Sequence, residues 1–176
     1  YRPCITEHWL RSQVFASYNI TLEEQLSFYS GPAFLPWFRM GNMRGFGGPI
    51  TEEWLLARRD LQIKVLGRMR SLGMTPVLSG FSGHVPKEFV AKYPSVKISR
   101  SPDWANFNAG DPVTAPYADV YLMEPTEKLF AEIGNKYIAL QAATFGTDHI
   151  YNTDTYNEMD PPTWNTTYLA EASEAV

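Results

Sequence analysis

The sequence predicts an α/β fold with parallel strands, because amphipathic helical segments twice lead through a glycine into a short apolar run. These joints lie at Gly73 and Gly146. Polar residues gather after each apolar run, as they do at the carboxyl ends of the strands in a (β/α)8 barrel. A complete barrel takes roughly 250 residues. The chain has 176 residues, so we expect a partial, open TIM barrel of about three βα units.

The composition is that of one globular domain, residues 1–176, with 44% hydrophobic residues and a formal net charge of −4. A mildly acidic chain lacks the basic surface that nucleic acids require, so nucleic acid is not an expected partner. No apolar run approaches the roughly 20 residues that span a bilayer, so no membrane segment is expected. The single cysteine, Cys4, excludes an internal disulfide and a zinc site built from cysteines.

The first quarter of the chain predicts two helices and a loop. A helical pattern covers residues 6–17, and a capping box formed by Thr21 and Glu24 begins a second, short helix. Residues 45–49 are glycine-rich and predict a loop. They lack the spacing of a phosphate-binding loop, so nucleotide binding is not expected. The apolar face of the first helix comprises Trp9, Leu10, Val14 and Phe15.

The clearest predicted helix covers about residues 51–72, with Thr51 as its N-cap and Gly73 as its left-handed stop. The buried stripe that we expect on it comprises Trp54, Leu61, Val65, Met69 and Leu72. Its solvated face is expected to carry Arg58, Arg59, Lys64, Arg68 and Arg70.

Each of the two predicted strands follows a helix. An apolar run over residues 74–81 follows the first joint, and a strand beginning at residues 149–151 follows the second. The helix before the second strand covers residues 126–144. Its inward residues are expected to be Leu129, Phe130, Ile133, Tyr137 and Leu140.

Candidate chemistry lies just beyond these strands. Asn157 and Glu158 follow the second strand, where a barrel glycosidase can place a carboxylic acid that protonates the glycosidic oxygen. A helix cap or a surface ion pair is the other interpretation of this glutamate. His84 follows the first strand and is either a structural hydrogen-bonding residue or a site residue. His8, His84 and His149 have no metal-ligand spacing, so no metal is expected.

Aromatic residues are frequent, with 5 Trp, 10 Tyr and 10 Phe. They are first of all core residues, but several stand beside Asn, Gly and carboxylates at segment ends. Sugar rings are stacked in such surroundings, so an aromatic sugar site is the second interpretation.

Several long blocks resemble the α-N-acetylglucosaminidases of glycoside hydrolase family 89. The longest is GPAFLPWFRMGN, residues 31–42. The blocks are collinear and cover nearly the whole chain. The others are MRSLGMTPVL (residues 69–78), GHVP (83–86), WANFN (104–108), FGTDHIY (145–151) and DTYNEM (154–159).

The resemblance implies a fragment of a catalytic TIM barrel that removes terminal α-linked N-acetylglucosamine with retention of configuration and without a cofactor. It implies Glu158 as the general acid/base and Asn157 as a substrate contact, with Trp37 and Trp104 lining the sugar pocket. Asn42 and His84 lie in matching blocks and are candidate substrate-binding residues. The family's nucleophile, a second glutamate, lies further along the barrel than residue 176, so the isolated chain is expected to be inactive.

Animal relatives in this family act in lysosomal heparan sulfate breakdown. The sequons at Asn19 and Asn165 suit a lysosomal or secreted glycoprotein, if the source is eukaryotic. The expected partner is a carbohydrate with terminal α-N-acetylglucosamine. The sequence does not decide between a monomer and a homo-oligomer. The alternative is a non-catalytic N-acetylglucosamine-binding remnant, and a barrel glycosidase of another specificity is a third interpretation.

Overall fold

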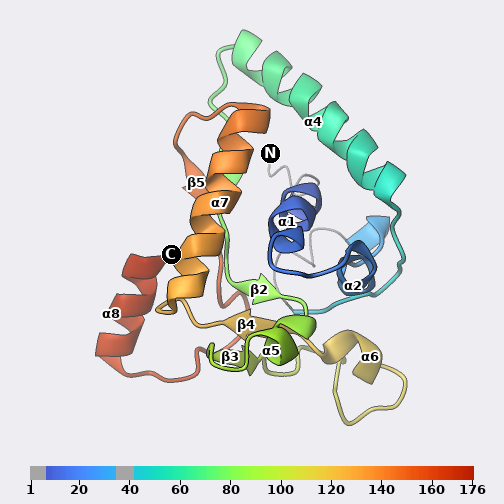
Figure 1. The fold of residues 1–176 in the computed structure, drawn as a ribbon, viewed down its shortest axis with the longest axis vertical. Coiled ribbons are helices and arrows are strands. Elements are labelled where there is room, and N and C mark those ends of the chain that lie inside the picture. The colour runs from blue at the N-terminus through green and yellow to red at the C-terminus, as the bar shows by residue number, and fades with distance from the viewer. Residues whose placement is uncertain (1–6, 35–41) are drawn as a thin grey trace.

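The computed structural model describes residues 7–34 and 42–176, in which helices flank two small β-sheets (Figure 1). The α/β class is confirmed. In chain order the elements are α1 (Glu7–Ala16), α2 (Leu22–Phe28), the 3-10 helix η1 (Pro32–Phe34), α4 (Glu52–Ser71), β1 (Leu78–Ser79), β2 (His84–Val85), α5 (Glu88–Lys92), β3 (Ile98–Arg100), α6 (Ala115–Ala118), β4 (Tyr121–Met123), α7 (Lys128–Phe145), β5 (Tyr151–Asn152) and α8 (Thr166–Ala175).

The two helix–glycine–strand joints produce the predicted parallel pair. Strand β1 follows α4, β5 follows α7, and the two strands pair in parallel with Ser79 opposite Asn152. Gln141 of α7 donates a 2.9 Å hydrogen bond to the Ser79 carbonyl, and the Tyr137 and Ser79 hydroxyls lie 2.8 Å apart. Helix α7 is therefore fastened to the strand that it covers.

The second sheet is antiparallel, with the order β2–β4–β3, and it lies below α1 and α7 in Figure 1. His84 pairs with Leu122, and Ser99 also pairs with Leu122 from the other side. The sequence analysis expected parallel strands alone and missed this sheet. Its strands are two or three residues long, too short for a two-residue periodicity to be visible.

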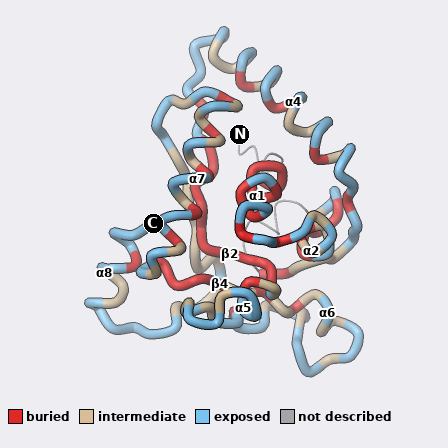
Figure 2. The backbone as a smooth tube through the Cα atoms, in the orientation of Figure 1, coloured by how far each residue is buried: buried red, intermediate tan, exposed pale blue. Residues whose placement is uncertain are grey.

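Helix α1 lies between α4 and α7 and forms the centre of the core (Figure 1). Figure 2 shows burial concentrated along α1 and β2, whereas α4 is buried only at spaced points. Phe15 of α1 packs edge-on against Phe81 and Phe89, with ring centroids 6.4 and 5.2 Å away. Phe81 in turn packs against Phe130 and Tyr137 of α7. These aromatic residues, which come from α1, α5, α7 and the segment after β1, are thus core residues.

The buried face predicted from hydrophobic periodicity is correct for α7 and wrong for α4. On α7 the predicted inward residues Phe130, Ile133 and Tyr137 are buried, and Leu129 and Leu140 are half-buried. On α4 the predicted stripe is wrong. The buried residues are Leu55, Gln62 and Leu66, whereas Leu61 is 44% exposed and Leu72 is 59% exposed. Trp54, Val65 and Met69 are half-buried.

The error on α4 is a rotation by one residue, about 100° around the helix axis. Apolar residues occupy two adjacent rows of α4, and its packing against α1 and α7 determines which row is buried. The basic face was also only partly correct. Lys64 and Arg68 are exposed, but Arg70 donates to Asp148 at 2.8 Å and to the Phe145 carbonyl at 2.7 Å. Arg70 therefore joins the end of α4 to the segment after α7.

The predicted helix ends are confirmed. Thr21 and Glu24 form the capping box of α2, and the Thr51 hydroxyl accepts from the Trp54 amide at the start of α4. Gly73 follows α4 with φ +75°, and Gly146 follows α7 with φ +69°. These left-handed conformations favour glycine because a Cβ atom is disfavoured there.

Candidate functional site

Glu158 lies on a tight turn that follows β5. The turn is closed by the Met159 amide, which donates a 3.0 Å hydrogen bond to the Tyr156 carbonyl. This places Glu158 at the third position of the turn, where its φ is +53° and its side chain is exposed. Glycine and asparagine are the usual residues in such a conformation. The glutamate is therefore held in a backbone geometry that its own type disfavours.

The indole of Trp104 holds the carboxylate of Glu158. Its Nε1–H donates to Glu158 Oε2 at 2.8 Å, across 54 positions of sequence. Trp104 begins a tight turn after β3 and is half-buried. A tryptophan in this position offers a flat apolar face to a ligand and a polar N–H to the carboxylate. The structure thus brings two predicted site residues together.

Asn42 and Asn157 form the other contact of the turn. Asn42 Nδ2 donates to the Asn157 carbonyl at 3.0 Å and so orients the peptide that precedes Glu158. In the part of the chain that the structure describes, Asn42 Oδ1 and Asn157 Nδ2 are buried and have no hydrogen-bond partner. A buried polar group without a partner is costly, and neither amide atom is accessible to a ligand in this conformation.

His84 lies in a different environment from the turn. Its ring is buried, with Nδ1 3.0 Å from the Ser82 hydroxyl. Burial, and secondarily the charge of Arg11, lower the pKa of His84 to about 3, and only the nearby Thr155 backbone opposes this shift. The imidazole is therefore neutral at pH 7 and faces the protein interior. A role for His84 in substrate binding stays a prediction.

Arg11 organises the surroundings of His84. Its guanidinium donates to Glu7 Oε1 at 2.9 and 2.5 Å and to the His84 carbonyl at 2.5 Å. Ser82 Oγ lies 3.5 Å from the same guanidinium. Glu7 and Arg11 are each 1% exposed. We call Glu7, Arg11, Ser82 and His84 the inner polar cluster.

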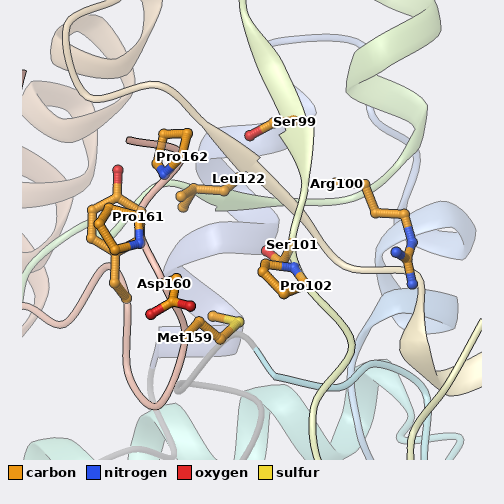
Figure 3. Close-up of a pocket in the computed structure, with 10 residues that line it drawn as sticks. Ser99, Arg100, Ser101, Pro102, Leu122, Met159, Asp160, Pro161 and Pro162 are labelled. Carbon is orange, nitrogen blue, oxygen red and sulfur yellow. The ribbon is translucent and has the colours of Figure 1, made fainter. Parts of the chain in front are cut away.

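A pocket of about 170 Å³ lies where the chain continues past Glu158 (Figure 3). Met159 and Asp160 border it on one side and Ser101 and Pro102 on the other, whereas the guanidinium of Arg100 points away (Figure 3). Arg100 pairs with Asp103 and lies 3.6 Å from Asp119. The Arg100 contact lowers the pKa of the Asp103 carboxyl. The remaining lining residues are Ser99, Leu122, Tyr156, Pro161 and Pro162.

Trp37, the remaining predicted site residue, lies outside the described residues. Among the residues that the structure describes, no group of three or more His, Cys, Asp or Glu could hold a metal ion. No helix within residues 7–34 and 42–176 is both long and apolar enough to cross a membrane.

The sequence analysis gave no role to Phe107, whose ring lies parallel to that of Trp104. It also missed Phe46, which it treated only as part of a glycine-rich loop. The available signal was an aromatic residue three positions after Trp104 and another between glycines. Neither pattern distinguishes a site residue from a core residue.

An exposed carboxyl group beside an indole and two amides can bind a sugar and exchange a proton with it, the combination on which glycoside hydrolases rely. The comparisons with known proteins agree with this class. The family model described as the "Alpha-N-acetylglucosaminidase (NAGLU) tim-barrel domain" matches residues 5–176. The chain belongs to this family, which confirms the resemblance seen in the sequence.

Human alpha-N-acetylglucosaminidase is 40% identical over 168 residues, which cover 96% of this chain and 22% of the human protein. A family 89 glycoside hydrolase from Clostridium perfringens, solved with 2-acetamido-1,2-dideoxynojirmycin, matches with a TM-score of 0.80 and 27% identity. A variant of the Clostridium enzyme, solved with its substrate GlcNAc-alpha-1,4-galactose, matches with a TM-score of 0.81 and 26% identity. Each match covers 97% of this chain and 19% of the solved chain. The chain thus spans about a fifth of the length of these relatives.

Proposed function

We propose that this chain supplies the acid/base half of the active site of a retaining glycoside hydrolase that removes terminal α-linked N-acetylglucosamine. Glu158 protonates the glycosidic oxygen as the bond breaks and later deprotonates the attacking water. The observation that carries the proposal is the turn at residues 156–159, which presents an exposed glutamate in a strained conformation beside Trp104.

Strain at Glu158 supports a chemical role over a structural one. A left-handed conformation costs a residue other than glycine about 1–2 kcal/mol. A glutamate that served only as a helix cap or in a surface ion pair would gain nothing from this position. The bond from Asn42 to the Asn157 carbonyl and the bond from Trp104 hold the group where it stands.

The neighbouring residues have distinct proposed roles. Asn157 contacts a polar substituent of the sugar, and Asn42 orients the Asn157 peptide. Trp104 forms an apolar wall against the sugar ring, with Trp37 as a second wall. His84 acts at most from behind the site, because its ring is buried.

Retention of configuration requires a second carboxyl group about 5–5.5 Å from the first. In the family this nucleophile lies further along the barrel, so we assign it to a part of the enzyme outside the present sequence. The activity is therefore proposed for the complete enzyme, and the chain alone is expected to be inactive. The parallel strands β1 and β5 are proposed as barrel strands within about three βα units.

The proposal includes a lysosomal or secreted location for a eukaryotic source. Both sequon asparagines, Asn19 and Asn165, are exposed. The Asn165 Oδ1 caps α8 by accepting from the amides of Thr167 and Tyr168. Glycosylation occurs on Nδ2, which this cap leaves free. Heparan sulfate as the substrate rests only on the animal members of the family.

The decisive variant is Glu158→Gln in the complete enzyme. It is expected to lower kcat/KM for GlcNAc-alpha-1,4-galactose by about 10²–10⁴-fold, the usual contribution of a general acid. A 4-nitrophenyl glycoside should suffer much less, because its leaving group needs little protonation. Glu132→Gln is the matched control, since Glu132 is an exposed glutamate on α7. Unchanged turnover of the disaccharide by the Glu158 variant would contradict the proposal.

A further inference from the structure

Behind Trp104 stands a group of aromatic rings that the proposed acid/base chemistry does not use. The Phe107 ring is parallel to the Trp104 ring, with 5° between the planes and 6.0 Å between the centroids. Phe46 meets Phe107 edge-on at 5.2 Å, and Phe34 meets Phe46 edge-on at 4.6 Å. Tyr117 of α6 closes the group, 5.0 Å from Phe46. We call Trp104, Phe107, Phe46, Phe34 and Tyr117 the aromatic column.

The backbone between Trp104 and Phe107 favours the stacking of their rings. The Phe107 amide donates to the Trp104 carbonyl at 2.9 Å, and the two residues form an isolated antiparallel bridge. Ala105, between them, has φ +51°, which reverses the chain. The side chains of two residues paired across such a turn leave the backbone on the same face. Rotation of the indole toward Phe107 is therefore blocked by the second ring.

The glycine-rich loop seen in the sequence carries the next ring of the column. The Gly31 amide donates to the Phe46 carbonyl at 2.9 Å, which fixes the loop against the chain before η1. A Cβ atom on Gly31 would lie 1.6 Å from the Gly47 carbonyl oxygen, so the two backbones approach as only glycine permits. Gly47 has φ +67°, and a Cβ there would lie 2.7 Å from the Phe34 ring. The close approach of the two backbones thus fixes the position of Phe46 against Phe107.

We propose that Phe107 and Phe46 are positioning residues for the acid/base group, acting through the indole of Trp104. The column fixes the Trp104 ring, and the ring's N–H fixes Oε2 of an otherwise exposed Glu158 side chain. This inference rests on the proposed function. Correct placement has a large kinetic value, since a displacement of about 1 Å at a reacting group can cost about 100-fold in rate.

The test compares leaving groups in the complete enzyme. Phe107→Leu keeps an apolar side chain but removes the parallel ring. We expect kcat/KM for GlcNAc-alpha-1,4-galactose to fall about tenfold, and that for the 4-nitrophenyl glycoside to fall less than about twofold. Phe107→Tyr keeps the ring and should restore both values. Phe46→Leu should give a smaller effect of the same kind, because it acts one ring further away.

The matched control is Tyr93→Leu. Tyr93 is half-buried, stacks on Phe89 at 5.5 Å and donates from its hydroxyl to the Tyr18 carbonyl at 3.1 Å, so its loss removes core contacts and none of the contacts described at the turn. It should change the two kcat/KM values by the same factor. If Phe107→Leu and Phe46→Leu do the same, or leave both values unchanged, the positioning role is wrong. If Glu158→Gln itself fails to discriminate between the substrates, the proposed function is wrong, and the two failures are distinguishable.

Discussion

The inner polar cluster and the turn at Glu158 both join residues that are far apart in the sequence. Their carboxylates differ in exposure, in backbone conformation and in hydrogen-bond partner. Glu7 is 1% exposed, lies in a regular helix and is bonded by the Arg11 guanidinium. Glu158 is exposed, has a left-handed backbone and accepts from Trp104. The inner arrangement uses its charges for internal bonding, whereas the turn keeps its carboxylate available to a ligand.

The comparison also separates residues that the sequence motifs group together. His84 and Asn42 both lie in blocks shared with the family. The structure places His84 among buried charges, whereas Asn42 contacts the backbone of the turn. Both side chains are buried, so membership in a shared block and burial together do not separate the two environments, whereas the hydrogen bonds do.

The largest effect on stability is expected from Arg11→Met. It removes the guanidinium that bonds to the buried Glu7 carboxylate, and the loss of one member of a buried ion pair costs about 3–5 kcal/mol of the free energy of unfolding. Urea denaturation of the protein that carries this chain measures the change. The double variant Glu7→Leu/Arg11→Met should recover most of the loss, because it removes both members of this buried ion pair. A double variant as unstable as Arg11→Met would show that the ion pair is not the cause.

A second test concerns the pH dependence of the inner cluster. The folded state holds the pKa of His84 at about 3, below the usual 6.5, so protonation favours the unfolded chain. The stability that the neutral ring contributes is complete above pH 6.5 and is lost as pH falls toward 3. Below pH 6.5 the free energy of unfolding of the parent should fall more steeply with falling pH than that of His84→Asn. Parallel stability profiles for parent and variant would mean that the ring does not stay neutral.

The smallest expected effect tests the strain at the turn. Glu158→Gly should be about 1 kcal/mol more stable than Glu158→Ala, because only glycine adopts a positive φ without cost. The same pair of substitutions at Glu132, inside α7, should reverse the order, since glycine costs about 1 kcal/mol in a helix. Thermal denaturation of the four variants decides the matter. The same order at both positions would remove the argument from strain.

The sequence predicted local features well. The capping box at Thr21, the stop at Gly73 and the inward face of α7 all depend on residues within one or two helical turns. The prediction of the buried face of α4 failed because its two apolar rows are equivalent until α1 and α7 are placed. The antiparallel sheet failed because strands as short as β2 show no periodicity.

The same distinction applies to the site. Glu158, Asn157, Asn42 and Trp104 were predicted, largely through family resemblance, and the structure brings them together. Their contacts could not be predicted, since Trp104 reaches Glu158 across 54 positions and Asn42 reaches Asn157 across 115. Nothing in the sequence around Glu158 indicated a positive φ, because glutamate is an unusual residue in that conformation.

The left-handed conformation of Glu158 also has an evolutionary consequence, because the residue type at this position is expected to depend on activity. Backbone preference alone would place glycine or asparagine there, so the proposed acid/base role predicts that the glutamate is kept only where that role is needed. A duplicated copy released from that requirement should drift toward glycine or asparagine at this position and become more stable as it loses activity. The residue at this one position would then distinguish active copies from inactive ones.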